Sequence, residues 1–288
     1  MAKTRELRRR IRSVEKTRQT TKTMEMVATS RFKRAQDRVV GARPYAKALA
    51  DMLGDLYSPE FGERFPLLRA PTGTPRRVAV VGLSSNRGLC GAFNANLIRE
   101  TRARVEALEA QGTEVELHLI GRKCIGFFRF IGRSIASQRQ DIGDRPTQEH
   151  AQQILDPLLA RYAVGELDGV EIIFAHFVSA LTTPPARLQV LPLPAPRRTG
   201  KRVPNYILRP SAEALLEALL PLYLRTQVFR ALAETAASEQ GARRTAMKNA
   251  TDSAGDMIDT LRRSLNRARQ AQITQEIAEI VGGAAAQQ

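Results

Sequence analysis

The C-terminal part of the chain carries a hydrophobic repeat that requires a second helix beside it. Between Ser211 and Val281, alternating steps of four and three residues land mainly on apolar side chains, which is the spacing of a coiled-coil seam. Alanine dominates where a stable zipper would place leucine and isoleucine. Small side chains let two helices approach closely but bury little apolar area each. The run therefore predicts a long rod whose remaining surface serves other contacts.

The N-terminal residues carry a matching repeat. The same stepping runs from Leu7 to Leu56, and only Arg18, Thr21 and Glu25 interrupt it. Two such runs at opposite ends of one chain predict an intramolecular antiparallel pair, on the order of 75 to 105 Å long at about 1.5 Å per residue. A bundle of ordinary amphipathic helices is the alternative. Periodic patterns much longer than about 25 residues favour the coiled coil.

Between the two repeats, the pattern changes to alternating strands and helices. Apolar, β-rich runs predict strands over 77–83, 115–120, 169–178 and 187–193. Helical spacing predicts helices over 92–110, 122–131 and 146–162. This alternation predicts an open α/β (Rossmann-like) domain with a mostly parallel sheet.

The predicted fold class is therefore α/β: a long antiparallel two-helix coiled coil from the N- and C-termini plus a central open α/β domain. The predicted division is a helix over 1–58, the α/β domain over 76–210 and a helix over 211–288, with the two helices forming one shaft. Residues 58–76, rich in proline and glycine, predict a linker. Pro44 inside the first repeat predicts a kink or a division of that helix.

The charge is strongly positive and unevenly placed. The net charge is +16, and residues 1–58 hold fifteen Lys and Arg against six Asp and Glu, whereas residues 211–288 hold nine of each. Such a basic strip fits nucleic acid, acidic phospholipid or an acidic protein surface. No run approaches the roughly 20 apolar residues that span a bilayer, and the N-terminus lacks the apolar region of a secretory signal. We therefore expect no direct insertion into lipid.

The sequence offers little catalytic chemistry. The turn over 81–91 lies where a phosphate loop would, but no Lys-Ser/Thr pair follows Gly88, and only Gly88 and Gly91 keep the Rossmann spacing. The two cysteines give no disulfide framework, which fits a reducing compartment, and with the three histidines they lack metal-ligand spacing. Cys90 is expected to be a small buried residue rather than a reactive thiol. We expect no catalytic residues, no cofactor and no metal.

Four segments carry a resemblance to a known family. They are TKTMEMVATSRFKRAQ near the N-terminus, the turn SSNRGLCGAFN, the block SEQGARRTAMKNATDSAGDMID and the tail ARQAQITQEIAEIVGGAAA. Together, and in this order, they resemble the gamma subunit of F-type ATP synthase, in its bacterial form.

The resemblance implies a fold and a function. In that family the terminal helices form an asymmetric antiparallel coiled coil inside a hexamer of alternating alpha and beta subunits, while the α/β domain and the epsilon subunit sit on the membrane c-ring. Proton flow turns the ring and the shaft, and the shaft biases each catalytic beta site in turn. The implied location is the cytoplasmic face of the bacterial inner membrane, as a peripheral, non-catalytic subunit. The acidic partner of the basic strip is then a loop on beta, with no nucleic acid involved.

The resemblance also implies positions of contact with beta and of coupling. By position in the motifs, these are Met24, Arg243, Gln270, Thr274, Glu276 and Glu279. Arg243 lies on the seam, and we expect it to face a partner or to pair with an acid such as Glu25. The chain departs from the family pattern at Asn86, where aspartate is usual, and at Ala92, Thr245 and Ala278.

Two other functions remain open from the residues alone. A coiled-coil protein that binds nucleic acid would use the net charge and would bind with steep salt dependence, although the basic strip has few aromatic side chains for stacking on bases. A nucleotide-using α/β enzyme with helical arms would bind nucleotide through residues 76–210.

Overall fold

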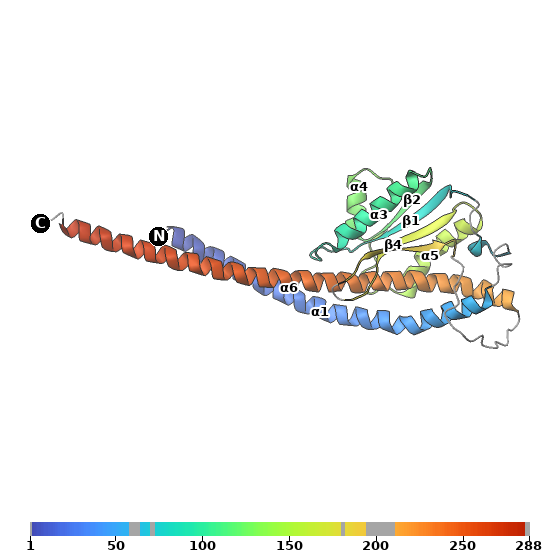
Figure 1. Ribbon diagram of the computed structural model, residues 1–288, viewed down its shortest axis with the longest axis horizontal. Coiled ribbons are helices and arrows are strands. Elements are labelled where there is room, and N and C mark those ends of the chain that lie inside the picture. The colour runs from blue at the N-terminus through green and yellow to red at the C-terminus, as the bar shows by residue number, and fades with distance from the viewer. Residues whose placement is uncertain (1, 58–63, 70–72, 180–181, 194–210, 286–288) are drawn as a thin grey trace. The chain divides into compact units, whose positions relative to one another are not determined.

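A computed structural model describes residues 2–57, 64–69, 73–179, 182–193 and 211–285. Two long helices dominate it (Figure 1): α1 spans Ala2–Leu56 and α6 spans Ala212–Ala285. The chain divides into two compact units, one made of residues 1–28 with 244–288 and the other of residues 29–243. Both helices contribute to both units. The three-part division by residue number given above stays a prediction.

Within the first unit, α1 and α6 pair antiparallel. Thr21 contacts Thr251 through their hydroxyl groups at 2.8 Å, and Arg262 donates to Glu15 at 3.0 Å. From one contact to the next, the residue number on α1 falls while that on α6 rises. The two helices therefore run in opposite directions, which confirms the predicted antiparallel coiled coil. α1 continues through Pro44 as one helix, so Pro44 does not divide it. The alternative, a kink at Pro44, stays a prediction. None of the helices in the described ranges is long and apolar enough to cross a bilayer.

The second unit contains a five-stranded sheet, and its α/β class was predicted correctly. Its strands are β1 Arg77–Leu83, β2 Glu114–Ile120, β3 Ser137–Arg139, β4 Gly169–Ala175 and β5 Pro185–Leu191. Their order in the sheet is β3-β2-β1-β4-β5; the first four are parallel and β5 is antiparallel to β4. β1 lies at the centre. β2 and β3 follow on one side of it, and β4 and β5 on the other. This change of side gives the sheet its Rossmann-like topology.

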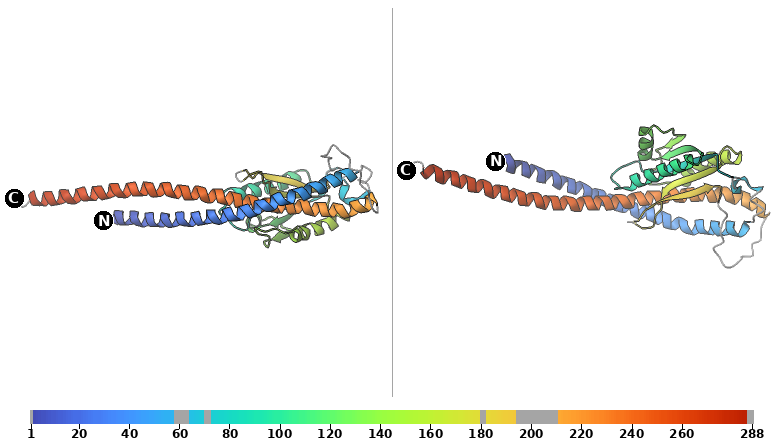
Figure 2. Two further views of the ribbon diagram at one scale, coloured as in Figure 1. Left: turned by 90° about the horizontal axis from the view of Figure 1, so that it is seen from below. Right: turned by 45° about the horizontal axis from the view of Figure 1, so that its top comes forward.

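Helices cover both faces of the sheet, as a mostly parallel sheet requires. The connecting helices are α3 Phe93–Glu109, α4 Arg122–Phe130 and α5 Gln148–Ala163. α3 and α4 bury Val105 and Phe128 against one face. On the other face, α5, α1 and α6 contribute Leu155, Leu53 and Leu220 to a larger core. Within this unit α6 lies between α1 and the sheet (Figures 1 and 2).

Two elements were not predicted. β3 has the polar sequence Ser-Gln-Arg, so it gives no hydrophobic signal. The predicted linker over 58–76 contains a 3-10 helix, η1 Pro66–Leu68, which buries Leu68 in the larger core. The backbone of η1 also accepts a hydrogen bond, from the Leu193 N–H to the Leu67 carbonyl at 3.2 Å. Residues 58–63 and 70–72 of this linker, and 194–210 before α6, lie outside the described residues.

Candidate functional site

A strip of polar side chains on α6 is buried within the second unit. It comprises Thr226, Gln227, Glu234, Thr235, Ser238, Glu239 and Gln240, each at most 8% exposed. Buried polar groups are stable only when they are hydrogen-bonded. The partners of this strip therefore show where α6 is attached to the α/β domain.

The end of β4 is the first attachment. The Glu234 carboxylate accepts a hydrogen bond from the Phe177 N–H at 3.1 Å and contacts Nδ1 of His176 at 2.6 Å. The Thr235 hydroxyl accepts from the Ala175 N–H at 3.3 Å, and the Ser238 hydroxyl donates to the Ala175 carbonyl at 3.4 Å. These three α6 side chains satisfy backbone groups that a strand end otherwise leaves open.

The turn after β1 is the second attachment. Arg243 donates to the Gly88 carbonyl at 3.3 Å and to the Glu239 carboxylate at 2.7 Å. Burial raises the pKa of Glu239, and the neighbouring Arg243 opposes that rise. Arg243 therefore contacts the acid four residues earlier on its own helix, Glu239, whereas the acid named above as an example is Glu25. That Arg243 faces a partner stays a prediction. Its side chain is only 13% exposed.

Cys90 lies in the same turn and is buried, as predicted. Its sulfur accepts a hydrogen bond from the Asn94 amide at 3.1 Å, and burial raises the pKa of its thiol. Cys124 is also buried, and burial raises the pKa of its thiol to about 12. Because the thiolate is the nucleophile, both positions disfavour thiol chemistry.

The two attachments lie at the carboxyl ends of β1 and β4, which are neighbours in the sheet. In open α/β sheets this is the switch point, where strand order reverses and where ligands usually bind. Here α6 supplies Glu234, Thr235, Ser238 and Arg243 to that edge. A helix of the same chain therefore lies at the edge where Rossmann folds usually bind nucleotide, and this agrees with the lack of a phosphate-loop pattern in the 81–91 turn.

Asn86, one of the departures from the family pattern, uses both ends of its amide. Its Nδ2 donates to the carbonyls of Gln140 at 2.8 Å and Ile142 at 3.1 Å, while its Oδ1 accepts from the Arg122 N–H at 2.9 Å. An ionised aspartate accepts only. The amide therefore joins the β1 turn to the segment after β3 in a way that a carboxylate does not match.

We expect Asn86→Asp to lower the free energy of unfolding by about 1–3 kcal/mol at neutral pH, because two carbonyl oxygens would face a carboxylate. The carbonyls favour the neutral acid, so the folded-state pKa of the new carboxyl rises above its unfolded value. Stability is then lost as pH rises through that pKa and recovers below about pH 4. Urea unfolding at neutral pH and below about pH 4 measures this difference in stability. Asn96→Asp is the matched control, because the Asn96 Oδ1 already accepts from Arg99 at 2.5 Å; an equal loss in the control would contradict the explanation.

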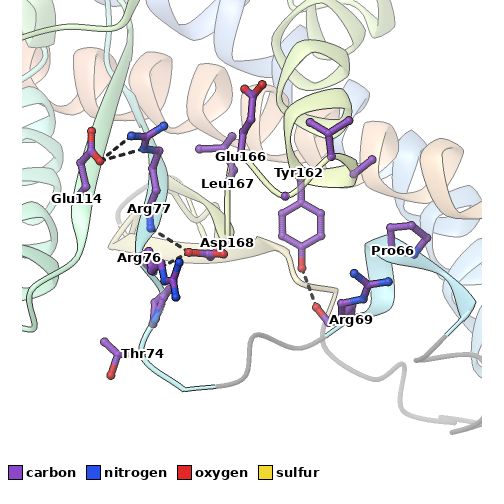
Figure 3. Close-up of a pocket in the computed structure, with 14 residues that line it drawn as sticks. Pro66, Arg69, Thr74, Arg76, Arg77, Glu114, Tyr162, Glu166, Leu167 and Asp168 are labelled. Carbon is purple, nitrogen blue, oxygen red and sulfur yellow. Dashed lines mark hydrogen bonds and ion pairs between the residues drawn. The ribbon is translucent and has the colours of Figure 1, made fainter.

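A hollow of about 700 Å³ lies at the opposite edge of the sheet (Figure 3). The Asp168 carboxylate accepts from the N–H groups of Arg76 at 2.6 Å and Arg77 at 3.0 Å, and the Arg77 side chain binds Glu114 at 2.8 Å. The Tyr162 hydroxyl donates to the Arg69 carbonyl at 2.8 Å, and burial raises the pKa of Tyr162 to about 12. These groups bind one another, so we interpret the hollow as a structural joint at the amino ends of β1 and β4.

The coiled-coil seam of the first unit combines small, larger apolar and polar side chains. Ala28, Met247, Ala254 and Ile258 are buried in it. Thr21, which interrupts the sequence repeat, fits because its hydroxyl contacts Thr251 across the seam. The outer faces of both helices stay exposed in this unit, as the alanine-rich repeat predicted.

The six predicted contact residues fall into two groups. Met24 on α1 is 39% exposed, and Gln270, Thr274 and Glu276 are exposed on α6, all in the first unit. Their hydrogen bonds are local: Thr274 donates to the Gln270 carbonyl at 3.0 Å, and Glu276 accepts from Gln272 at 2.9 Å. Glu279 is within α6, but its side chain lies outside the described residues. Arg243 belongs to the second unit, where its side chain contacts its own chain.

Comparisons with known proteins agree with this architecture. The family model for ATP synthase (ATP-synt) matches residues 3–287. The ATP synthase gamma chain of Gemmatimonas aurantiaca is 59% identical over 290 residues, covering 100% of both chains, and that of Leptospira biflexa is 42% identical, covering 99% of both. A chain in the cryo-EM structure of the Euglena gracilis mitochondrial ATP synthase (OSCP/F1/c-ring, rotational state 3) shares the fold, with a TM-score of 0.69 and 19% identity over 99% of this chain and 94% of that one. The chain therefore belongs to the ATP synthase gamma chain family.

Proposed function

We propose that this chain is the central rotor shaft of an F-type ATP synthase and couples proton flow through a membrane c-ring to ATP synthesis or hydrolysis on beta subunits. It is a non-catalytic subunit and uses no cofactor. The observation that carries the proposal is the pair of long antiparallel helices, one of which fills the ligand-binding edge of the α/β domain. An α/β domain attached to α6 in this way is suited to pass torque to the two long helices, and less suited to bind a nucleotide.

The charges of α1 support an acidic partner. Arg5, Arg8, Arg9, Arg12 and Lys16 are all exposed on the first unit. We propose that this strip contacts the acidic loop of beta, inside a hexamer of alpha and beta subunits. Exposed Met24, Gln270, Thr274 and Glu276, together with Glu279, are proposed to contact beta as the shaft turns, and Arg243 is proposed to act in coupling.

The remaining partners follow from the family. We propose that epsilon and the c-ring bind the α/β domain, and that the complex lies at the cytoplasmic face of the bacterial inner membrane. The chain would then attach to the membrane through other subunits, without inserting into lipid and without binding nucleic acid.

Reversible cross-linking in the assembled complex tests the proposal. Cysteine at Gln270, joined by a disulfide to cysteine on the facing beta surface, is expected to stop ATP turnover, and reduction is expected to restore it. The matched control joins Thr4→Cys to Gln272→Cys, whose native side chains meet at 3.5 Å across the seam. That bond would tie the two shaft helices to each other and is expected to leave turnover intact. Undiminished turnover with the beta cross-link, or salt-dependent assembly with nucleic acid in place of alpha and beta, would contradict the proposal.

A further inference from the structure

Asp144, in the segment between β3 and α5, contacts both long helices within the second unit. Its carboxylate forms an ion pair with Arg31 of α1 and accepts a hydrogen bond from Nε2 of Gln240 of α6 at 2.9 Å. Its main-chain carbonyl accepts from Arg38 of α1 at 3.4 Å. One residue of the α/β domain thus contacts α1 twice and α6 once.

The surroundings favour a negative charge at this place. Arg31, Arg38 and Asp144 line a hollow of about 440 Å³ with three further arginines, Arg34, Arg87 and Arg145, and one further aspartate, Asp141. Five arginines against two aspartates create a positive potential that a carboxylate complements. Asp141 binds Arg139 in its own segment, with Nε to Oδ1 at 3.1 Å.

The burial of Gln240 is a second, independent reason to expect that its contact with Asp144 matters. It is 1% exposed, and within the described residues its Oε1 is buried without a hydrogen-bond partner. A buried amide is costly unless it is hydrogen-bonded. The bond from its Nε2 to Asp144 compensates part of that cost and gives the buried glutamine a directional role.

The apolar contacts at the same level have little directionality. Ala35 and Val39 of α1 pack on Ala233 and Ala237 of α6, with Phe177 of the α/β domain beside them. Small apolar surfaces resist separation but allow sliding, because the hydrophobic effect is non-directional. Charge-assisted hydrogen bonds have a defined geometry and oppose such sliding.

We propose that Asp144 is a positioning residue for rotary coupling: it holds α1 and α6 in register with the α/β domain, so that torque from the domain enters both helices together. This inference rests on the proposed function. Without Asp144, rotation of the domain would be absorbed partly by slippage of one helix past the other, and fewer protons would be moved per ATP hydrolysed.

The test uses the assembled, membrane-bound complex with Asp144→Asn, which keeps the shape of the side chain and removes its charge. The matched control is Asp141→Asn in the same segment. We expect Asp144→Asn to assemble normally and hydrolyse ATP, but to pump fewer protons per ATP and to show larger angular fluctuations of a probe on the α/β domain when the shaft is fixed. Hydrogen exchange of the amides over 140–146 is expected to accelerate roughly ten-fold. The control is expected to leave the protons pumped per ATP and the angular fluctuations unchanged.

A second pair of variants separates positioning from general loosening. Gln240→Glu places a second carboxylate against Asp144 and is expected to uncouple in the same way. The double variant Asp144→Asn, Gln240→Glu reverses donor and acceptor and is expected to recover part of the coupling. Uncoupling of both single variants with this recovery supports the inference. Normal coupling and normal fluctuations in Asp144→Asn would overturn it, as would uncoupling without any recovery. A wild-type chain that fails to restore ATP-driven proton pumping to a complex lacking gamma would instead contradict the proposed function.

Discussion

Replacing Gly121 with alanine is expected to lower the free energy of unfolding by at least about 3 kcal/mol. Gly121 joins β2 to α4 with φ at +99°, a conformation that side chains rarely adopt, and a Cβ atom there would lie 2.1 Å from the carbonyl oxygen of Ser84. The backbone has little room to relax. The Gly121 N–H donates to the Arg139 carbonyl at 2.9 Å, and the Ser84 N–H donates to the Ile120 carbonyl at 2.8 Å.

Gly126→Ala is the matched control for this prediction. Gly126 lies inside α4, five residues away, and a Cβ atom there would meet nothing within 4 Å. Alanine at an exposed helix position is favoured over glycine by up to about 1 kcal/mol, so this variant should be as stable as the parent or more stable. Urea unfolding of the full chain measures both. Equal stability of the two variants would show that the backbone at 121 relaxes freely.

The consequence of the Gly121 change extends to the helix contacts. Ser84 begins the turn whose Gly88 carbonyl accepts from Arg243, and the Ser84 hydroxyl also donates to the Gly121 carbonyl at 3.2 Å. A displaced turn would therefore weaken the attachment of α6 as well as the core. We expect faster hydrogen exchange at the amides after β1 in this variant.

The parts of this fold that were predicted are those with a local repeat. The spacing of apolar side chains is visible in the sequence itself, so the two long helices, the four longer strands and the helices between them were all recognised. β3 was missed because Ser137, Gln138 and Arg139 are polar and the strand pairs along one side only. Leu68 was assigned to a linker because the prolines and glycines around it outweigh one short apolar cluster.

The attachment of α6 was not predicted, because its contacts join residues far apart in the chain. Glu234 and Phe177 are separated by 57 positions, and Gln240 and Asp144 by 96. A repeat indicates which face of a helix is buried but not what the polar residues on that face bind. The available signal was the cluster of polar residues over 234–240 within an alanine-rich helix, which periodicity alone could not match to the strand ends.

Glu234→Ala is expected to have the second large effect, a loss of about 2 to 3 kcal/mol in local stability at the end of β4. The Glu234 side chain is 4% exposed and is shared by three groups: the Phe177 N–H, His176 and the guanidinium of Arg230, whose Nε lies 3.4 Å from Oε1. Its removal leaves a buried backbone N–H without an acceptor and a cation without its carboxylate. Both costs add to the loss of the contact itself.

The measurement follows the Phe177 amide, because the expected loss of stability is local to the end of β4. Hydrogen exchange at that amide should be faster by roughly a hundred-fold or more in Glu234→Ala. In Glu217→Ala, an exposed position on the same helix, it should stay unchanged. Protection of Phe177 that survived the Glu234 change would mean that the backbone at the end of β4 finds another acceptor. Glu234 would then not be the group that holds α6 to the end of β4, and the attachment there would rest on the contacts of Thr235 and Ser238 with Ala175.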